Sequence, residues 1–274
     1  MVVQFASTMK HLFSCWEAIA YKFKSAKHNF LLFDYDGTLT PIVKRPESAH
    51  LSPQTRDCLQ ELASNPSLTL GIISGRALND LRSKVDIANA LYVGNHGLEI
   101  EGHNISFVSP QAIQAMPLLH SLGQDISLAL AGIEGVWIED KRLTLSLHYR
   151  LVPEAQCSRL NEIFNEITKE SLAYDRIRVT SNKKTYDIRP PVNWDKGKAI
   201  EFINKRLFPN DKVFMLFAGD DKTDYDAFNV VNTAQGISVF VGNTNIESPA
   251  CYFLQSPDEV HKLLLKLQAI LNCQ

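Results

Sequence analysis

Short, almost wholly apolar runs alternate with longer amphipathic stretches in the first and last thirds of the chain. The apolar runs are residues 30–33, 68–73, 91–93, 213–218 and 236–241. An apolar run of this length that ends at turn residues is typical of a strand buried on both faces. Stretches with helical spacing separate the runs, among them residues 53–63 and 195–207. Strands that alternate with helices predict an α/β fold with a doubly wound parallel sheet.

The pattern changes between residues 110 and 191. Two long helical stretches, 110–131 and 153–172, are each followed by a pair of short strands joined at a polar turn. This αββαββ order predicts an antiparallel sheet with helices on one face. We interpret residues 110–191 as an α+β cap domain inserted into a core domain made of residues 29–109 and 192–274.

The N-terminal segment has helical periodicity of its own. Phe5, Met9, Leu12, Trp16 and Ile19 recur at spacings of three and four, which predicts an amphipathic helix over residues 5–24. We treat residues 1–28 as a separate N-terminal helix packed on the protein itself. A helix that binds a partner or a membrane surface is less favoured, because its polar face is not strongly basic.

The composition is that of an ordinary globular protein and excludes several classes. Of the 274 residues 45% are hydrophobic and 21% are charged, and the net charge is −2. This charge gives no basic field for nucleic acid, and no apolar run approaches the ~20 residues of a membrane span. The five cysteines include no CxxC pair, which favours reduced thiols in a cytoplasmic protein. We expect a cytoplasmic monomer that binds neither nucleic acid nor membrane.

Two aspartates directly follow the first apolar run. Asp34 and Asp36 are two residues apart, so in an extended chain they point to the same side of the strand end. Ligands of open α/β sheets bind at this carboxyl edge. Paired carboxylates repel one another unless a cation or a shared proton is present, and Mg²⁺ prefers such oxygen ligands. An ordinary Asx turn explains Asp36 and Gly37 but not Asp34.

Other polar residues stand at the ends of later strands or the starts of helices. Ser74 follows the second apolar run, Lys196 opens a helix, and the fourth run ends in Gly219-Asp220-Asp221-Lys222-Thr223-Asp224. A hydroxyl near a helix start can bind a phosphoryl oxygen. Taken alone, however, Ser74 is better explained as a helix cap and Lys196 as a surface lysine. The acidic cluster after a buried strand is more specific.

The D-Y-D-G-T-L sequence and these later residues, in this order, resemble the four motifs of the haloacid dehalogenase superfamily of phosphotransferases. The resemblance implies that Asp34 is the nucleophile and Asp36 the general acid and base. Mg²⁺ would be held by Asp34, the backbone carbonyl of Asp36, and Asp220. Ser74 and Lys196 would bind the phosphoryl oxygens.

The remaining acidic residues of the last motif have supporting roles in this reading. Asp224 would orient metal-bound water or Lys196. Asp221 could act as a metal ligand, like Asp220, or have the same orienting role as Asp224. Lys198 competes with Lys196 for the role of the fixed positive charge, and the Lys-Gly pattern of the superfamily favours Lys196.

Over residues 29–274 the chain resembles the trehalose-6-phosphate phosphatase family more closely. The motifs that carry this resemblance are Asp34 to Leu39 followed by Pro41-Ile42-Val43, Ser74-Gly75-Arg76, Gly94-Asn95-His96-Gly97, Glu139-Asp140-Lys141 with His148-Tyr149-Arg150, Ile188-Arg189-Pro190, Asp195-Lys196-Gly197-Lys198 and the Asp220 cluster. The resemblance implies a Mg²⁺-dependent hydrolysis of trehalose 6-phosphate to trehalose and phosphate through an aspartyl-phosphate.

In that family the cap covers the active site, and its side chains recognise the sugar. The matching cap residues are Glu139, Lys141 and Asp187, where the family usually has Glu in place of Asp187. Further substrate-binding residues implied by the resemblance are Thr38, Arg76 and Asn95. From the residues alone, Glu139 and Lys141 are also explained as solvated charges on one face of a strand.

Three alternatives stay open. The enzyme could act on another sugar phosphate, such as a sucrose or glucosylglycerol phosphate. It could be a phosphotransferase such as a phosphomutase, if the aspartyl-phosphate were shielded from water. It could also be a non-catalytic sugar-phosphate-binding module, although the loss of Asp34 or Asp36 that would favour this is not observed.

Overall fold

The structure is a computed structural model of the 274-residue chain, and it describes residues 9–43, 45–182, 184–244 and 246–272. The described chain divides into two compact units. The larger unit contains residues up to 107 and from 194 onward, and the smaller unit contains residues 108–193. The smaller unit is therefore an insertion in the sequence of the larger one.

A single mixed sheet forms the centre of the larger unit. Among the described residues it has nine strands, in the order β1-β13-β12-β11-β2-β3-β4-β5-β6. Every pairing from β1 to β4 is parallel, and β5 runs antiparallel to β4. The strands are β1 (Lys10–His11), β2 (Asn29–Asp34), β3 (Leu68–Ile73), β4 (Leu91–Gly94), β5 (Glu99–Gly102), β6 (Ile105–Val108), β11 (Phe214–Gly219), β12 (Ile237–Val241) and β13 (Tyr252–Leu254).

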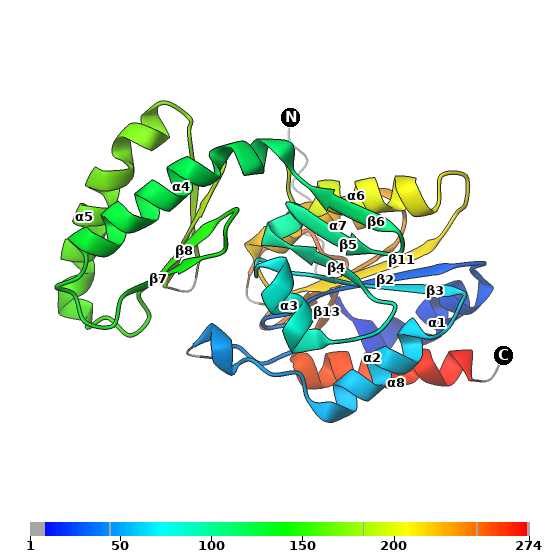
Figure 1. Cartoon of the computed structure of the whole chain (residues 1–274). Coiled ribbons are helices and arrows are strands. Elements are labelled where there is room, and N and C mark those ends of the chain that lie inside the picture. The colour runs from blue at the N-terminus through cyan, green and yellow to red at the C-terminus, as the bar shows by residue number, and fades with distance from the viewer. Residues whose placement is uncertain (1–8, 44, 183, 245, 273–274) are drawn as a thin grey trace, which may run out of the picture. The chain divides into compact units, whose positions relative to one another are not determined.

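Helices cover both faces of this sheet (Figure 1). One face packs against α1 (Trp16–Ser25), α2 (Pro53–Ala63), α3 (Leu78–Val85) and α8 (Pro257–Leu271), and the other packs against α6 (Lys196–Leu207) and α7 (Tyr225–Thr233). Because successive side chains of a strand point to opposite faces, Leu31 and Phe33 enter the first core while Phe30 and Leu32 enter the second. This double burial is why the central strands are continuous apolar runs.

The smaller unit has its own antiparallel sheet. Four strands in the order β7-β8-β10-β9 are found in its described residues. The strands are β7 (Trp137–Asp140), β8 (Leu145–His148), β9 (Arg178–Asn182) and β10 (Thr185–Arg189), and the helices are α4 (Pro110–Ala129) and α5 (Glu154–Ala173). Leu145, Leu147 and Ile188 pack with α4 and α5 in a separate core. The predicted parallel core and inserted αββαββ cap sheet are confirmed.

The predicted N-terminal helix is wrong for residues 10–15. Lys10–His11 form β1, which pairs in parallel with the edge strand β13, a 3₁₀ turn covers Leu12–Cys15, and α1 begins only at Trp16. An edge strand exposes unpaired backbone groups, and this pairing outweighs the helical spacing of the side chains. Residues 1–8 lie outside the described residues.

None of the helices in the described residues is both long and apolar enough to cross a bilayer.

Candidate active site

The predicted catalytic residues of the larger unit meet at the carboxyl edge of its sheet. Asp34 is the last residue of β2, Ser74 follows β3, and Asp220 follows β11. These strands are neighbours, with Asp34 in register with Ile73 and Phe33 with Ala218. The register of the parallel strands therefore brings together residues that are far apart in the sequence. We call Asp34, Lys196, Asp220 and Asp224 the strand-end site.

Lys196 joins two carboxylates at the centre of this site. Its Nζ donates to Asp34 Oδ1 at 2.7 Å and to Asp224 Oδ1 at 2.7 Å. The side chains of Lys196 and Asp224 are 2% and 0% exposed, and that of Asp34 is 7% exposed. A lysine in the first turn of a helix is usually solvated, so its burial between two acids marks it as part of a site.

The charges of this site are unbalanced. Burial raises the pKa of Asp34 well above its ordinary value and also raises the pKa of Asp224, and the ammonium of Lys196 opposes both shifts. Burial by itself would lower the pKa of Lys196, but the charges of Asp224 and Asp34 raise it above its ordinary value. Two carboxylates thus share one ammonium, and Asp220 adds a further acid. A cation would relieve this excess of negative charge.

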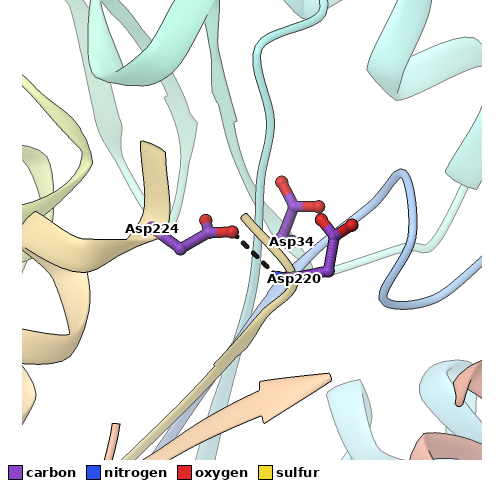
Figure 2. Close-up of side chains that lie close together, drawn as sticks. All are labelled: Asp34, Asp220 and Asp224. Carbon is purple, nitrogen blue, oxygen red and sulfur yellow. Dashed lines mark hydrogen bonds between the residues drawn. The ribbon is translucent and has the colours of Figure 1, made fainter. Parts of the chain in front are cut away.

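Asp224 is held by bonds to both of its oxygens. While Oδ1 accepts from Lys196, Oδ2 accepts from the backbone N–H groups of Asp220 at 2.9 Å and Asp221 at 3.1 Å. Asp221 in turn accepts from Thr223 N at 2.8 Å and caps the turn. Asp34, Asp220 and Asp224 lie close enough to bind one metal ion (Figure 2), with a ligand atom from each within 4.8 Å of the others. Both oxygens of Asp224 already accept hydrogen bonds, whereas Lys196 bonds only one oxygen of Asp34, so Asp34 and Asp220 are the stronger candidates for metal ligands.

The loop after Asp34 is shaped to receive Asp220. Gly37 has a φ of +93°, and a Cβ at that position would collide with the Asp220 carboxylate. The Asp220 side chain therefore lies directly on the backbone that follows Asp36. In the same loop, the Oγ1 of Thr38 is fully buried and has no hydrogen-bond partner among the described residues. An oxygen-rich cradle with an unsatisfied hydroxyl fits a hard cation such as Mg²⁺.

Asp36 faces a different partner from Asp34. Its carboxylate accepts from Arg76 through Nε–H to Oδ2 at 2.6 Å and through Nη2–H to Oδ1 at 2.7 Å. Arg76 also donates to Asp80 Oδ2 at 2.7 Å and to the backbone oxygen of Pro46 at 2.7 Å. Burial would lower the pKa of Arg76, but the bonds to Asp36 and Asp80 raise it above its ordinary value. The paired arginine fork fixes the orientation of Asp36.

Ser74 is held by the loop that follows β4. Its backbone oxygen accepts from His96 N at 3.0 Å, and its Oγ accepts from Arg76 N at 3.2 Å. Asn95 is fully buried, and its Nδ2 donates to Glu99 Oε1 at 2.5 Å. Asn95 and His96 both have positive φ, a conformation in which few residues other than glycine are found. This strained loop positions Ser74, and a direct contact of Asn95 or Arg76 with substrate stays a prediction.

The predicted sugar-binding residues lie together on one face of the cap sheet in the smaller unit. Lys141 Nζ is 3.8 Å from Glu139 Oε2 and 4.0 Å from Asp187 Oδ1. Ser146 Oγ donates to Asp187 Oδ1 at 2.5 Å, and His148 Nε2 is 2.9 Å from Glu139 Oε2. The opposite face of these strands carries the apolar core. We call these five residues the cap-sheet cluster.

Comparison with known proteins gives a consistent result. The family model described as Trehalose-phosphatase matches residues 32–258, a range that spans the strand-end site and the cap-sheet cluster. The chain belongs to the trehalose-phosphatase family. Family membership classes it as a phosphoric monoester hydrolase, and the resemblance inferred from the motifs is confirmed.

Two curated relatives that this trehalose-phosphatase family member resembles come from plants. "Probable trehalose-phosphate phosphatase 4" of Oryza sativa subsp. japonica is 34% identical over 260 residues, which cover 93% of this chain and 69% of the relative. "Trehalose-phosphate phosphatase B" of Arabidopsis thaliana is 32% identical over 253 residues, which cover 88% of this chain and 66% of the relative. The chain thus spans about two thirds of the length of each of these proteins.

Solved structures share the fold. The C-terminal domain of a C. albicans trehalose-6-phosphate phosphatase aligns with a TM-score of 0.82 at 25% identity, covering 96% of this chain and 99% of that domain. A haloacid dehalogenase-like hydrolase from Bacteroides thetaiotaomicron, at 15% identity and a TM-score of 0.59 over 88% of this chain and all of that one, shows the fold alone. These matches confirm the haloacid dehalogenase-like fold predicted for this trehalose-phosphatase family member.

Two residues that hold other residues of the site in place, Asp80 and Trp194, were not predicted from the sequence of this trehalose-phosphatase family member. Asp80 bonds Arg76 from one helical turn away, a spacing of four that could have revealed it. Trp194 Nε1 donates to the backbone oxygen of Gly97 at 2.6 Å, and a Cβ on Gly97 would collide with the backbone of Asp195. This close approach ties the loop after β4 to the start of α6, where Lys196 lies.

Proposed function

We propose that the chain hydrolyses trehalose 6-phosphate to trehalose and inorganic phosphate through a phosphorylated Asp34. The observation that carries this proposal is the buried Lys196 ammonium, which bonds one oxygen of Asp34 at 2.7 Å and is itself anchored by Asp224. Lys196 leaves the other oxygen of Asp34, Oδ2, as the nucleophile. A carboxylate held in this way needs no further ordering before it attacks.

Phosphoryl transfer takes two steps in this proposal. Asp34 Oδ2 forms a bond to phosphorus while the bond from phosphorus to the sugar oxygen breaks, and Asp36 gives its proton to that oxygen. Asp36 then takes a proton from a water molecule that attacks phosphorus, and the bond to Asp34 breaks to release phosphate. Lys196 and Ser74 stabilise the charge on the phosphoryl oxygens.

The fork between Arg76 and Asp36 suits the second step. A guanidinium that donates two parallel bonds stabilises the ionised carboxylate, which is the form that accepts a proton from water. In the first step Asp36 must carry a proton, so the two bonds from Arg76 must loosen when the phosphate ester binds. Arg76 thus acts on the reaction by positioning Asp36.

We further propose that Asp34, the backbone carbonyl of Asp36, and Asp220 hold Mg²⁺. When bound, Mg²⁺ would neutralise phosphate charge and so lower the repulsion between the ester and the anionic Asp34. The excess of carboxylates over ammonium groups at the strand-end site supports this assignment, as does the buried hydroxyl of Thr38.

The cap-sheet cluster supplies the sugar specificity in this proposal. Trehalose offers hydroxyl groups and no charge, and carboxylates accept hydrogen bonds from hydroxyls while an ammonium donates to them. The ammonium of Lys141 lies within 4.0 Å of the carboxylates of both Glu139 and Asp187, so the cluster presents both kinds of group. The Ser146 bond fixes the shorter side chain of Asp187 in place.

The test is phosphate release from trehalose 6-phosphate, glucose 6-phosphate and sucrose 6-phosphate, each with Mg²⁺ and with EDTA. We expect strong turnover of the trehalose ester that EDTA abolishes and Mg²⁺ restores. Preferred turnover of another ester would overturn the substrate but retain the chemistry. The absence of turnover by folded protein with every ester would instead favour a binding module.

Two further expectations stay predictions. We expect the protein to be monomeric, which light scattering on a sizing column would test. We expect it to be cytoplasmic, which fractionation of the native cells would test.

A further inference from the structure

An aromatic residue lies beside the charged residues of the cap-sheet cluster. Trp137 in β7 is the cross-strand partner of His148 in β8. The two rings are stacked, with centroids 4.7 Å apart and an angle of 13° between their planes. Because Trp137 and Glu139 are two residues apart on one strand, their side chains share a face. The indole therefore stands on the polar face of the sheet, away from the apolar core.

His148 is fixed by both of its ring nitrogens. Nε2 is 2.9 Å from Glu139 Oε2, and Nδ1 is 3.3 Å from Thr185 Oγ1 on the neighbouring strand. The imidazole cannot turn without losing both contacts, so it forms a rigid support for the indole. The Trp137 side chain is only partly buried, so part of the indole surface is accessible to a ligand.

The indole and the charged groups beside it are complementary to the apolar face and to the hydroxyl groups of a pyranose ring. The C–H groups on one face of a pyranose are apolar and stack well on a flat aromatic ring, whereas its hydroxyl groups need polar partners. Glu139 supplies a carboxylate on the same strand, and Lys141 lies 3.8 Å from that carboxylate. Binding sites for small polar ligands combine an aromatic surface with a few placed polar groups in this way.

We propose that Trp137, supported by His148, is a specificity-determining residue on which a glucopyranosyl ring of the substrate stacks. Glu139 and Lys141 bind the hydroxyl groups of that ring. The inference deepens the proposed function and rests on it. It assigns to Trp137 the preference for a disaccharide phosphate over a small phosphate ester, which the strand-end site alone does not provide.

The test compares Trp137→Leu and Trp137→Phe with wild type on trehalose 6-phosphate and on an aryl phosphate. We expect Trp137→Leu to lower kcat/KM for the trehalose ester about tenfold or more, as the loss of one aromatic stacking contact implies. The loss should fall mainly on KM, and the aryl phosphate should react as before. Trp137→Phe should recover most of the activity. Equal losses on both esters would indicate a structural role and overturn the proposal.

A binding experiment tests the contact without turnover. The chain has three tryptophans, at positions 16, 137 and 194. In an Asp34→Asn background, adding trehalose 6-phosphate should change the tryptophan fluorescence of the protein. The change should be strongly reduced in Trp137→Phe, with Trp194 as the source of any remainder, and keep its full size in the matched control Trp16→Phe, whose ring lies in α1 of the larger unit. A change of undiminished size in Trp137→Phe would overturn the proposal.

The outcomes separate this inference from the proposed function. If wild type hydrolyses trehalose 6-phosphate and Trp137→Leu behaves like wild type on both esters, the inference fails and the proposed function stands. If wild type prefers another ester, the proposed substrate fails. The same variants, measured on the preferred ester against the aryl phosphate, then decide whether Trp137 contributes to selectivity.

Discussion

The strand-end site and the cap-sheet cluster use the same kinds of side chain in opposite environments. At the strand-end site the Lys196 and Asp224 side chains are 2% and 0% exposed and the bonds between them are short. In the cap-sheet cluster the Lys141 and Glu139 side chains are 9% and 29% exposed and 3.8 Å apart. Buried charges are fixed and costly to disturb, whereas partly hydrated ones exchange partners readily.

The difference in burial between the two regions suits two tasks, phosphoryl transfer and discrimination between sugars. A phosphoryl group has the same shape and charge in every ester, so a rigid site can be complementary to its transition state. A sugar must be distinguished from other sugars by its hydroxyls, and hydrated polar groups can exchange water for hydroxyl at little cost. We therefore expect mutations in the two regions to separate chemistry from selectivity.

The largest effect should come from Asp34→Asn. Without a nucleophilic carboxylate, turnover should fall by at least about 10⁴-fold on every ester, as is usual when a nucleophile is removed. Phosphate release from trehalose 6-phosphate and from an aryl phosphate measures the loss, and circular dichroism checks the fold. Asp57→Asn, an exposed aspartate of α2, should leave both activities unchanged. Substantial activity in Asp34→Asn would refute the assignment of the nucleophile.

The next largest effect concerns stability. Lys196→Met leaves Asp34 and Asp224 buried without their shared ammonium, which should lower the free energy of unfolding by about 3–5 kcal/mol. Lys141→Met in the cap-sheet cluster should cost about 1 kcal/mol, because its carboxylate partners are more exposed. Urea denaturation of the metal-free proteins measures both values. Similar losses in the two variants would remove the contrast between the regions.

A smaller effect is expected for Glu139→Ala. Loss of its carboxylate should reduce kcat/KM for trehalose 6-phosphate by about 10- to 100-fold, the value of one hydrogen bond to a charged group, and leave an aryl phosphate almost unaffected. The matched control is Glu134→Ala, an exposed glutamate of the same unit. Equal losses on the two substrates would contradict the sugar-binding role of Glu139.

The smallest effect is the response of the strand-end site to pH. Burial raises the pKa of Asp34 and Asp224, so the folded protein holds these protons more tightly than the unfolded chain does. The metal-free protein therefore gains stability from these groups as the pH falls through the raised pKa values.

Metal binding requires the ionised carboxylates, so the stabilisation that Mg²⁺ provides decreases as the pH falls, opposite to the trend of the metal-free protein. The rise in Tm caused by Mg²⁺ should therefore shrink by a few degrees between pH 8 and pH 5, above the range where an ordinary aspartate takes up a proton. Thermal melts with Mg²⁺ and with EDTA at each pH measure it. A constant rise across this range would contradict the raised pKa values.

Most of the fold could be predicted from the sequence because burial on both faces leaves a simple pattern. Phe30 to Phe33 and Leu216 to Ala218 are apolar at every position, and such runs can only be central strands or buried helices. The helix predicted over residues 53–63 likewise coincides with α2, which begins at Pro53. β1 could not be predicted, because two residues carry no periodicity and their pairing with Tyr252 and Phe253 depends on distant sequence.

The sequence predicted those residues of the strand-end site that stand directly at the ends of strands. Asp34 and Asp220 were found because each ends an apolar run. The fork between Arg76 and Asp36 was not foreseen, because it joins residues 40 positions apart and depends on how two loops cross. The stacking of Trp137 on His148 was missed for the same reason, since it depends on the register of β7 against β8.

The insertion of the smaller unit has a consequence for how the protein is made. β2 lies between β3 and β11 at the centre of the large sheet, but β11 is translated only after all of residues 108–193. A contiguous unit can fold as soon as it leaves the ribosome, so the smaller unit is complete while β2 still lacks one neighbour. Asp34 meets its counter-ion, 162 residues further on, only after the smaller unit has been synthesised. The nascent chain thus carries the cap-sheet cluster before Asp34 has the ammonium that balances its charge.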